Sequence, residues 1–219
     1  MTTEKKDIRP PNDPWQTLNG SNDEGVLAYY ISDSSTKIPI RDITHENDPK
    51  ADPNLETKTF GLFSYCHETM RKKMINDGVN LLFFITKRLK EIEKNDGKKK
   101  LVGLRVLTGY YRVGWYYEIK EDDYALTASK IKFVYPGYPL EDLTEYLGES
   151  INTKFMQTKF IHGDTPKKLL QLIQKTPDST EQYIKEIHGK EQDALKKWGN
   201  MYRERKQGFT WEDAVKFIK

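Results

Sequence analysis

The sequence predicts an α+β fold in which an antiparallel sheet dominates and helices flank it. Runs rich in β-branched and aromatic residues follow one another in the middle of the chain, separated by turn residues or charged segments. Helical patterns with capping signals stand before and after these runs. Aromatic residues make up 12% of the chain, too many for a disordered one. We therefore expect a folded protein with one main core.

The N-terminal third offers one strand and two irregular segments. Residues 1–23 contain several prolines and asparagines and little apolar material, which predicts a mobile arm or a strap over the surface. Residues 26–31 read VLAYYI and predict the first strand. The polar stretch 32–58 contains three prolines and predicts a long loop, which in a compact domain is usually functional or disordered.

The middle of the chain predicts a helix and then a series of strands. Ser64 is a candidate cap for a helix over residues 65–77, and Gly78 favours the end of that helix. The segment 87–100 is polar and contains the hairpin dipeptide Asp96-Gly97. The expected strands are 81–86, 101–107, 110–119 and 124–134.

The last third predicts helices with one further strand. Pro139 opens a short helix, residues 155–161 form a strand, and Thr165-Pro166 caps a helix that ends near Pro177. Beyond Pro177, apolar residues recur at roughly helical spacing through a charged sequence. This tail is expected either to complete the core or to dock a protein partner or a second copy of the chain.

Composition excludes several classes of protein. No window holds the 18 or more apolar residues that a membrane span needs, so we expect no membrane partner. The charged N-terminus lacks the apolar stretch of a secretory signal, which favours a cytoplasmic location. Cys66 is the single cysteine, so neither an internal disulfide nor a multi-cysteine zinc site stabilises the fold.

The net charge of +3 is unevenly distributed along the chain. Residues 1–60 carry 7 basic and 11 acidic groups, residues 61–130 carry 14 and 9, and residues 131–219 carry 15 and 13. The middle is therefore the basic part. Its excess is modest, so binding of nucleic acid would also need shape or stacking.

Four segments together resemble EVE-type proteins of the PUA-like superfamily. They read SYCHETMRKKMINDGVNLLFFIT, KLVGLRVLTGYY, FVYPGYPLEDLTEYL and TKFMQTKFIHGDTPKKLLQLI, at residues 64–86, 100–111, 133–147 and 153–173. The resemblance implies a PUA-like curved antiparallel β-barrel with flanking helices over residues 24–176. Residues 1–23 would then be a mobile N-terminal arm, and residues 177–219 a C-terminal helical extension. Relatives of this family, including the YTH readers, hold a modified or flipped base among aromatic rings.

Aromatic and basic residues suit such a task. Residues 110–117 place rings on both faces of a strand, because side chains alternate, and each stacked base gains about 1 to 3 kcal/mol. The candidate base-binding residues are Trp115, Tyr116, Tyr110, Tyr65, Phe63, Tyr30 and Ser64. The candidates for contact with the nucleic-acid backbone are Arg105, Arg112, Lys87 and Arg88. The alternative is that half of these rings are core, that Ser64 only caps its helix and that the lysines form a solvated hairpin.

Catalytic signatures are missing from the sequence. Cys66 and His67 are adjacent, so on a helix they point about 100 degrees apart and cannot form a nucleophile and base pair by themselves. No HxxxH, H-x-E or CxxC spacing is present, and neither are the GxGxxG and P-loop patterns. We therefore expect neither a metal nor a cofactor.

These observations favour a non-enzymatic domain that binds DNA or RNA and recognises a base, plausibly a modified one, by aromatic stacking. Two alternatives stay open. One is a hydrolase or nucleotide-processing enzyme on a related barrel, with polar residues supplied by the long loop 32–58. The other is a protein-interaction module that uses exposed rings and the C-terminal helices.

Overall fold

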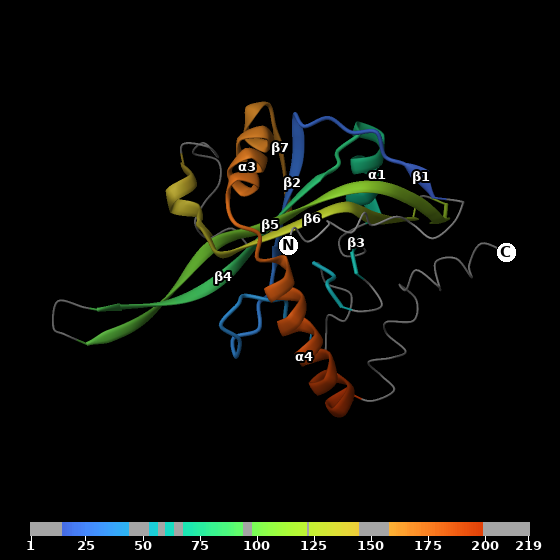
Figure 1. Ribbon diagram of the computed structural model, residues 1–219. Helices are drawn as coiled ribbons and strands as arrows, with labels where there is room; N and C mark the ends of the chain where they lie inside the picture. The colour runs from blue at the N-terminus through green and yellow to red at the C-terminus, as the bar shows by residue number, and fades with distance from the viewer. Residues whose placement is uncertain are drawn as a thin grey trace, which may run out of the picture.

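The computed structural model contains one seven-stranded sheet with helices packed on it (Figure 1). It describes residues 15–43, 53–56, 60–63, 68–93, 98–121, 123–144 and 158–198. The strands are β1 (Gln16–Thr17), β2 (Glu24–Tyr30), β3 (Leu62–Phe63), β4 (Leu81–Glu93), β5 (Lys99–Lys120), β6 (Asp123–Pro139) and β7 (Thr158–His162). The helices are α1 (Glu68–Asp77), the 3-10 helix η1 (Leu140–Leu143), α3 (Asp164–Lys175) and α4 (Thr180–Trp198).

The sheet is mostly antiparallel and open. Its strand order is β3-β6-β5-β4-β2-β7, with β1 added to the far end of β5, and β2 and β4 are its parallel neighbours. Within the described part of the chain, the end strands β3 and β7 do not pair with one another. The α+β class expected from the sequence is confirmed, whereas the sheet does not close into the expected barrel.

Two stretches expected as separate strands, residues 101–107 and 110–119, form the single strand β5. Register shifts against β6 near Gly109 and Val113 let this strand bend while it stays paired. A Cβ at Gly109 would lie 2.4 Å from the carbonyl oxygen of Lys132, so the close approach of β6 requires glycine there. The polar connection expected over residues 87–100 is also largely strand.

Apolar side chains are buried on both faces of the sheet. Leu82 and Phe84 point into a core shared with α1 and α4, while Leu81, Phe83 and Ile85 point into a core shared with α3 and η1. Alternation along a strand sends successive side chains to opposite faces. The uninterrupted apolar run of β4 is thus explained by cover on both faces.

The described part of the N-terminal segment is a strap. Trp15 and Leu18 are buried, Gln16 and Thr17 pair with Tyr116 and Trp115 of β5, and the amide of Leu18 donates to the carbonyl of Gly114 at 2.8 Å. Residues 1–14 of the expected mobile arm lie outside the described residues.

Helix α4 completes the core on its side of the sheet. The side chains of Tyr183 and Ile187 are buried in the core that contains Phe133. The amide of Ser179 donates to the carbonyl of Phe133 at 2.9 Å, and the amide of Phe133 donates to the hydroxyl of Thr180 at 2.9 Å. The sequence predicts that the tail either completes the core or docks a partner. The described part of α4 completes the core.

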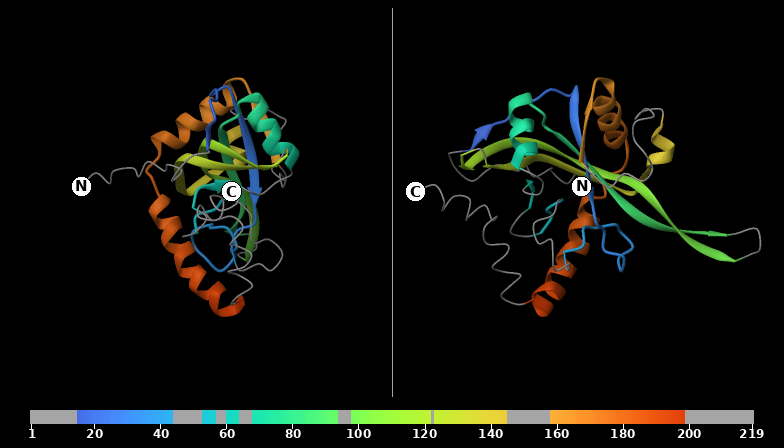
Figure 2. Two further views of the ribbon diagram at one scale, coloured as in Figure 1. Left: turned by 90° about the vertical axis from the view of Figure 1, so that its right-hand side faces the viewer. Right: turned by 180° about the vertical axis from the view of Figure 1, so that it is seen from behind.

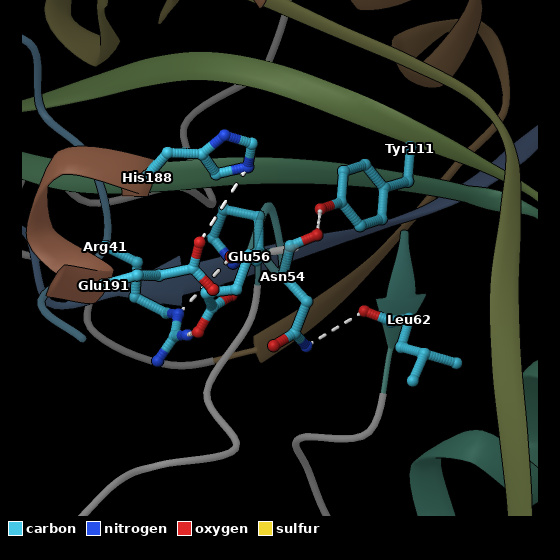
Figure 3. A network of polar contacts seen from close by, with 8 residues as sticks. Arg41, Asn54, Glu56, Leu62, Tyr111, His188 and Glu191 are labelled. Carbon is cyan, nitrogen blue, oxygen red and sulfur yellow. Dashed lines mark hydrogen bonds and ion pairs between the residues drawn. The ribbon is translucent and has the colours of Figure 1, made fainter. Parts of the chain in front are cut away.

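The long loop after β2 covers the α4 side of the sheet. Its described residues bury Ile40 and Leu55 in the core, and Arg41 forms an ion pair with Glu56 in which each side chain is only 1% exposed. Asn54 donates to the carbonyl of Leu62 at 3.0 Å and accepts at its own carbonyl from the Tyr111 hydroxyl at 2.8 Å. Figure 3 draws these contacts in one network with His188 and Glu191 of α4.

A second polar contact fastens this loop to α4. The Nζ of Lys190 lies 3.0 Å from the Oδ2 of Asp33 and donates to the hydroxyl of Ser35 at 2.7 Å. Burial alone would raise the pKa of Asp33, but hydrogen bonds from the Ser35 hydroxyl and amide, together with Lys190, outweigh it and lower that pKa. The carboxylate is therefore stabilised in its charged form by folding.

Replacing Glu56 tests the buried ion pair. The Glu56→Ala substitution should lower the free energy of unfolding by about 3 to 5 kcal/mol, because it leaves the Arg41 charge buried. The double change Arg41→Met with Glu56→Leu should cost less than the single one, since both charges are gone. Denaturant unfolding followed by circular dichroism measures both. The exposed pair Lys73–Asp77 supplies the control Asp77→Ala, and an equal loss in control and test would contradict the assignment.

Replacing Asp33 tests the fastening of the loop through its pH dependence. A lowered folded-state pKa contributes stability above the unfolded-state pKa of about 3.9, and that contribution is lost as the pH falls through the folded-state value. The Asp33→Asn variant should therefore melt at a lower temperature than wild type at pH 7, and the two melting temperatures should converge at acidic pH. A difference that stays constant from pH 7 to pH 3 would show that the charge of Asp33 is not involved.

Candidate nucleic-acid interface

Strands β4 and β5 continue beyond the rest of the sheet as a two-stranded hairpin. The last pair of β2 with β4 is Tyr30 with Thr86, and the last pair of β5 with β6 is Val106 with Pro139. From Lys87 with Arg105 onward, the two strands pair only with each other among the described residues. Figures 1 and 2 show this hairpin projecting from the body of the molecule. We call the described residues 87–93 and 98–105 the basic ribbon.

The net charge of the basic ribbon is larger than the net charge of the whole chain. It contains seven basic and two acidic residues, a net charge of +5. The other residues contain 29 basic and 31 acidic groups, a net charge of −2. The positive potential of this protein is therefore concentrated on one projecting element.

Cationic side chains occur on both faces of the ribbon. Residues directly opposite in an antiparallel pair share a face, and neighbours along a strand point to opposite faces. The register therefore places Lys87, Lys99 and Arg105 on one face, and Arg88 and Lys100 on the other. The three lysines are exposed and the two arginines are partly buried.

Two tyrosines hold the arginines at the root of the ribbon. The guanidinium carbon of Arg105 lies 5.0 Å from the ring centroid of Tyr29, and that of Arg88 lies 5.0 Å from the ring centroid of Tyr135. Arg88 also donates to the carbonyl of Pro136 at 3.2 Å and to the Tyr135 hydroxyl at 3.1 Å. Stacking on a ring restricts a guanidinium while leaving its charge in place.

Three of the proposed base-binding rings lie in the core. Tyr30, Phe63 and Tyr110 are 2%, 1% and 0% exposed. Tyr30 donates its hydroxyl to the carbonyl of Pro39, and Phe63 packs in the core on the α4 side. Tyr110 packs against Phe83 on the opposite side. The faces of these three rings contact the protein itself, so they offer no surface on which a base could stack in this structure.

Trp115 and Tyr116 lie at the other end of β5. Trp115 packs against the core around Trp15, and the Tyr116 hydroxyl donates to the side-chain carbonyl of Gln16 at 2.6 Å. Both rings are partly buried by the N-terminal strap. Ten residues separate Trp115 from Arg105, which is about 33 Å along a strand.

The remaining site residues divide into two groups. Arg112 lies in the middle of β5 and donates to the side-chain oxygen of Asn22 at 2.9 Å, away from the ribbon. Lys87, Arg88 and Arg105 come together at the root of the ribbon, as a common surface requires. Ser64 and Tyr65 lie outside the described residues.

Sequence reasoning missed the tyrosines that stack on the arginines. Neither Tyr29 nor Tyr135 is among the site residues predicted from the sequence. In each case the arginine lies two strands away in the sheet, on β5 for Tyr29 of β2 and on β4 for Tyr135 of β6. The contacts can therefore be inferred only once the strand order and the register are known.

Other chemistries find little support in the described part of the chain. No group of three or more histidine, cysteine, aspartate or glutamate side chains is placed there to hold a metal ion. The buried charged residues in the described part of the long loop are all paired, Arg41 with Glu56 and Asp33 with Lys190 of α4. None of the described helices combines the length and apolar character needed to cross a membrane.

Comparisons with protein-family models, with curated proteins and with solved structures found no match to this chain.

Proposed function

We propose that this protein binds nucleic acid and that the basic ribbon is its main contact surface. The observation that carries the proposal is the concentration of a net charge of +5 on one projecting hairpin of a chain whose other residues are net negative. Lysine and arginine that neutralise phosphates release condensed counterions, and this release supplies most of the affinity in non-specific binding. A projecting element brings its charges to a polyanion without contact between the acidic remainder and the phosphates.

Contact with phosphate is better supported than capture of a base. Of the seven rings and polar groups proposed from the sequence to bind a base, three are buried in the core. Trp115 and Tyr116 remain partly exposed, but the N-terminal strap covers them and they lie far from the ribbon. Recognition of a modified base would therefore depend on these two residues or on Ser64 and Tyr65.

The resemblance to EVE-type proteins remains part of the proposal. The order of elements supports it, since a helix that ends at a glycine with φ +66 leads into β4. Strand β5 returns along β4, and a proline-led short helix, a strand and a closing helix follow β6. The open sheet departs from the barrel that the resemblance implies.

Charge reversal on the ribbon tests the proposed function. Lys98 and Lys100 are exposed, and Lys98→Glu with Lys100→Glu should weaken binding of a fluorescent oligonucleotide at least tenfold near 0.1 M salt. The slope of log affinity against log salt is negative, and its magnitude should decrease by about 2, about one for each lost phosphate contact. Fluorescence anisotropy titrations at several salt concentrations measure both quantities.

The matched control reverses two exposed lysines elsewhere. Lys168 of α3 and Lys185 of α4 are both exposed, and Lys168→Glu with Lys185→Glu changes the net charge by the same amount. Affinity that falls equally in test and control would mean that the ribbon is not the binding surface. Binding to anionic lipid vesicles without binding to any oligonucleotide would overturn the proposed function in favour of a membrane surface.

A further inference from the structure

We propose that the basic ribbon inserts into the major groove of double-stranded DNA, with each of its faces against the phosphates of one strand. This inference rests on the proposed function and names the partner of the same surface. It depends on three features of the ribbon: the absence of aromatic side chains, the placement of charge on both faces, and its thickness.

The ribbon has no aromatic ring on which an unpaired base could stack. Residues 87–105 include no phenylalanine, tyrosine, tryptophan or histidine. Proteins that hold single strands combine a positive groove with aromatic rings on which successive bases stack. The two tyrosines at the root are already covered by Arg88 and Arg105. Contact along the ribbon is therefore made through phosphate charges, which favours a duplex.

Cations on both faces match phosphates on both sides, with Glu93 directly opposite Lys99 on one of the faces. Lys99 and Lys100 are neighbours on β5 and point to opposite faces of the ribbon. The arginines repeat this arrangement at the root, where Arg105 lies on the Tyr29 side and Arg88 on the Tyr135 side. A ribbon lying flat on a nucleic acid would use one face only. A ribbon between two walls of a groove uses both.

The dimensions of the ribbon select the groove. Sheets pack face to face about 10 Å apart, so a ribbon with side chains on both faces is about 10 Å thick. The major groove of B-DNA is about 12 Å wide and admits a two-stranded ribbon, whereas the minor groove is about 6 Å wide. The deep and narrow major groove of A-form RNA excludes such an element. Seven residues of β4 extend along the ribbon, from Lys87 to Glu93, which is about 23 Å of contact length.

The first test compares partners of equal sequence by anisotropy. Wild type should bind a 20-base-pair DNA duplex at least tenfold more tightly than either of its single strands or the corresponding RNA duplex. Methyl green, which occupies the major groove, should displace the protein, and netropsin, which occupies the minor groove, should not. Equal affinity for single strands, or displacement by netropsin alone, would overturn the inference while the proposed function stands. Failure to bind any nucleic acid would overturn both.

The second test separates the two faces of the ribbon. Lys99→Gln and Lys100→Gln should each reduce the magnitude of the slope of log affinity against log salt for duplex DNA by about 0.9. The double variant should reduce it by about twice that amount. Lys168→Gln on α3 is the control and should leave the slope unchanged. A slope that responds to only one of the two ribbon lysines would show that a single face contacts DNA, which contradicts insertion between two walls.

Discussion

The structure depends on the burial of both faces of β4 and on the point where that burial ends. From Leu81 to Ile85 every side chain of this strand is fully buried, because α1, α4 and the long loop cover one face and α3 covers the other. After Thr86 the neighbouring strand β2 has ended, and after Val106 the opposite neighbour β6 no longer pairs with β5. Beyond that point β4 and β5 pair only with each other among the described residues, and Lys87, Lys99 and Lys100 are exposed there.

This change of environment along one strand links the fold to the proposed function. The root of the ribbon continues directly from the buried segment of β4, while beyond Lys87 and Arg105 the two strands pair only with each other among the described residues. The arginines at the boundary use the last aromatic rings of the body as supports. Positive charge is thereby held on a rigid base and at a distance from the acidic remainder of the chain, which limits internal neutralisation of the charges that would meet phosphate.

Much of the secondary structure could be predicted from the sequence, because capping residues and periodicity are local signals. The helix before Gly78, the first strand and the helical tail to Trp198 all occur. Residues 87–93 and 99–100 are strand where the sequence predicts a polar connection, since lysine and glutamate are depleted in strands and nothing local reveals the partner strand. Local sequence patterns also do not predict whether the sheet closes, because closure depends on pairing between distant segments.

The candidate site was predicted in part, and the reasons are physical. Lys87, Arg88 and Arg105 come together because they lie near a hairpin in both sequence and space. Tyr110 looked accessible because alternation predicts that half of the rings face outward, but both faces of this sheet are covered. The core that contains Tyr110 includes Leu140 of η1 and Leu169 of α3, whose position over the sheet has no signature in the sequence of β5.

Removal of the ribbon is the most direct measurement of the central claim, that charge for nucleic acid is carried outside the core. Thr86 and Val106 are paired, so an Asn-Gly turn can join them in place of residues 87–105. The account predicts that the shortened chain unfolds cooperatively like the wild type and no longer binds the DNA duplex that wild type binds. Retained affinity would contradict the role of the ribbon, and loss of cooperative unfolding would contradict its separation from the core.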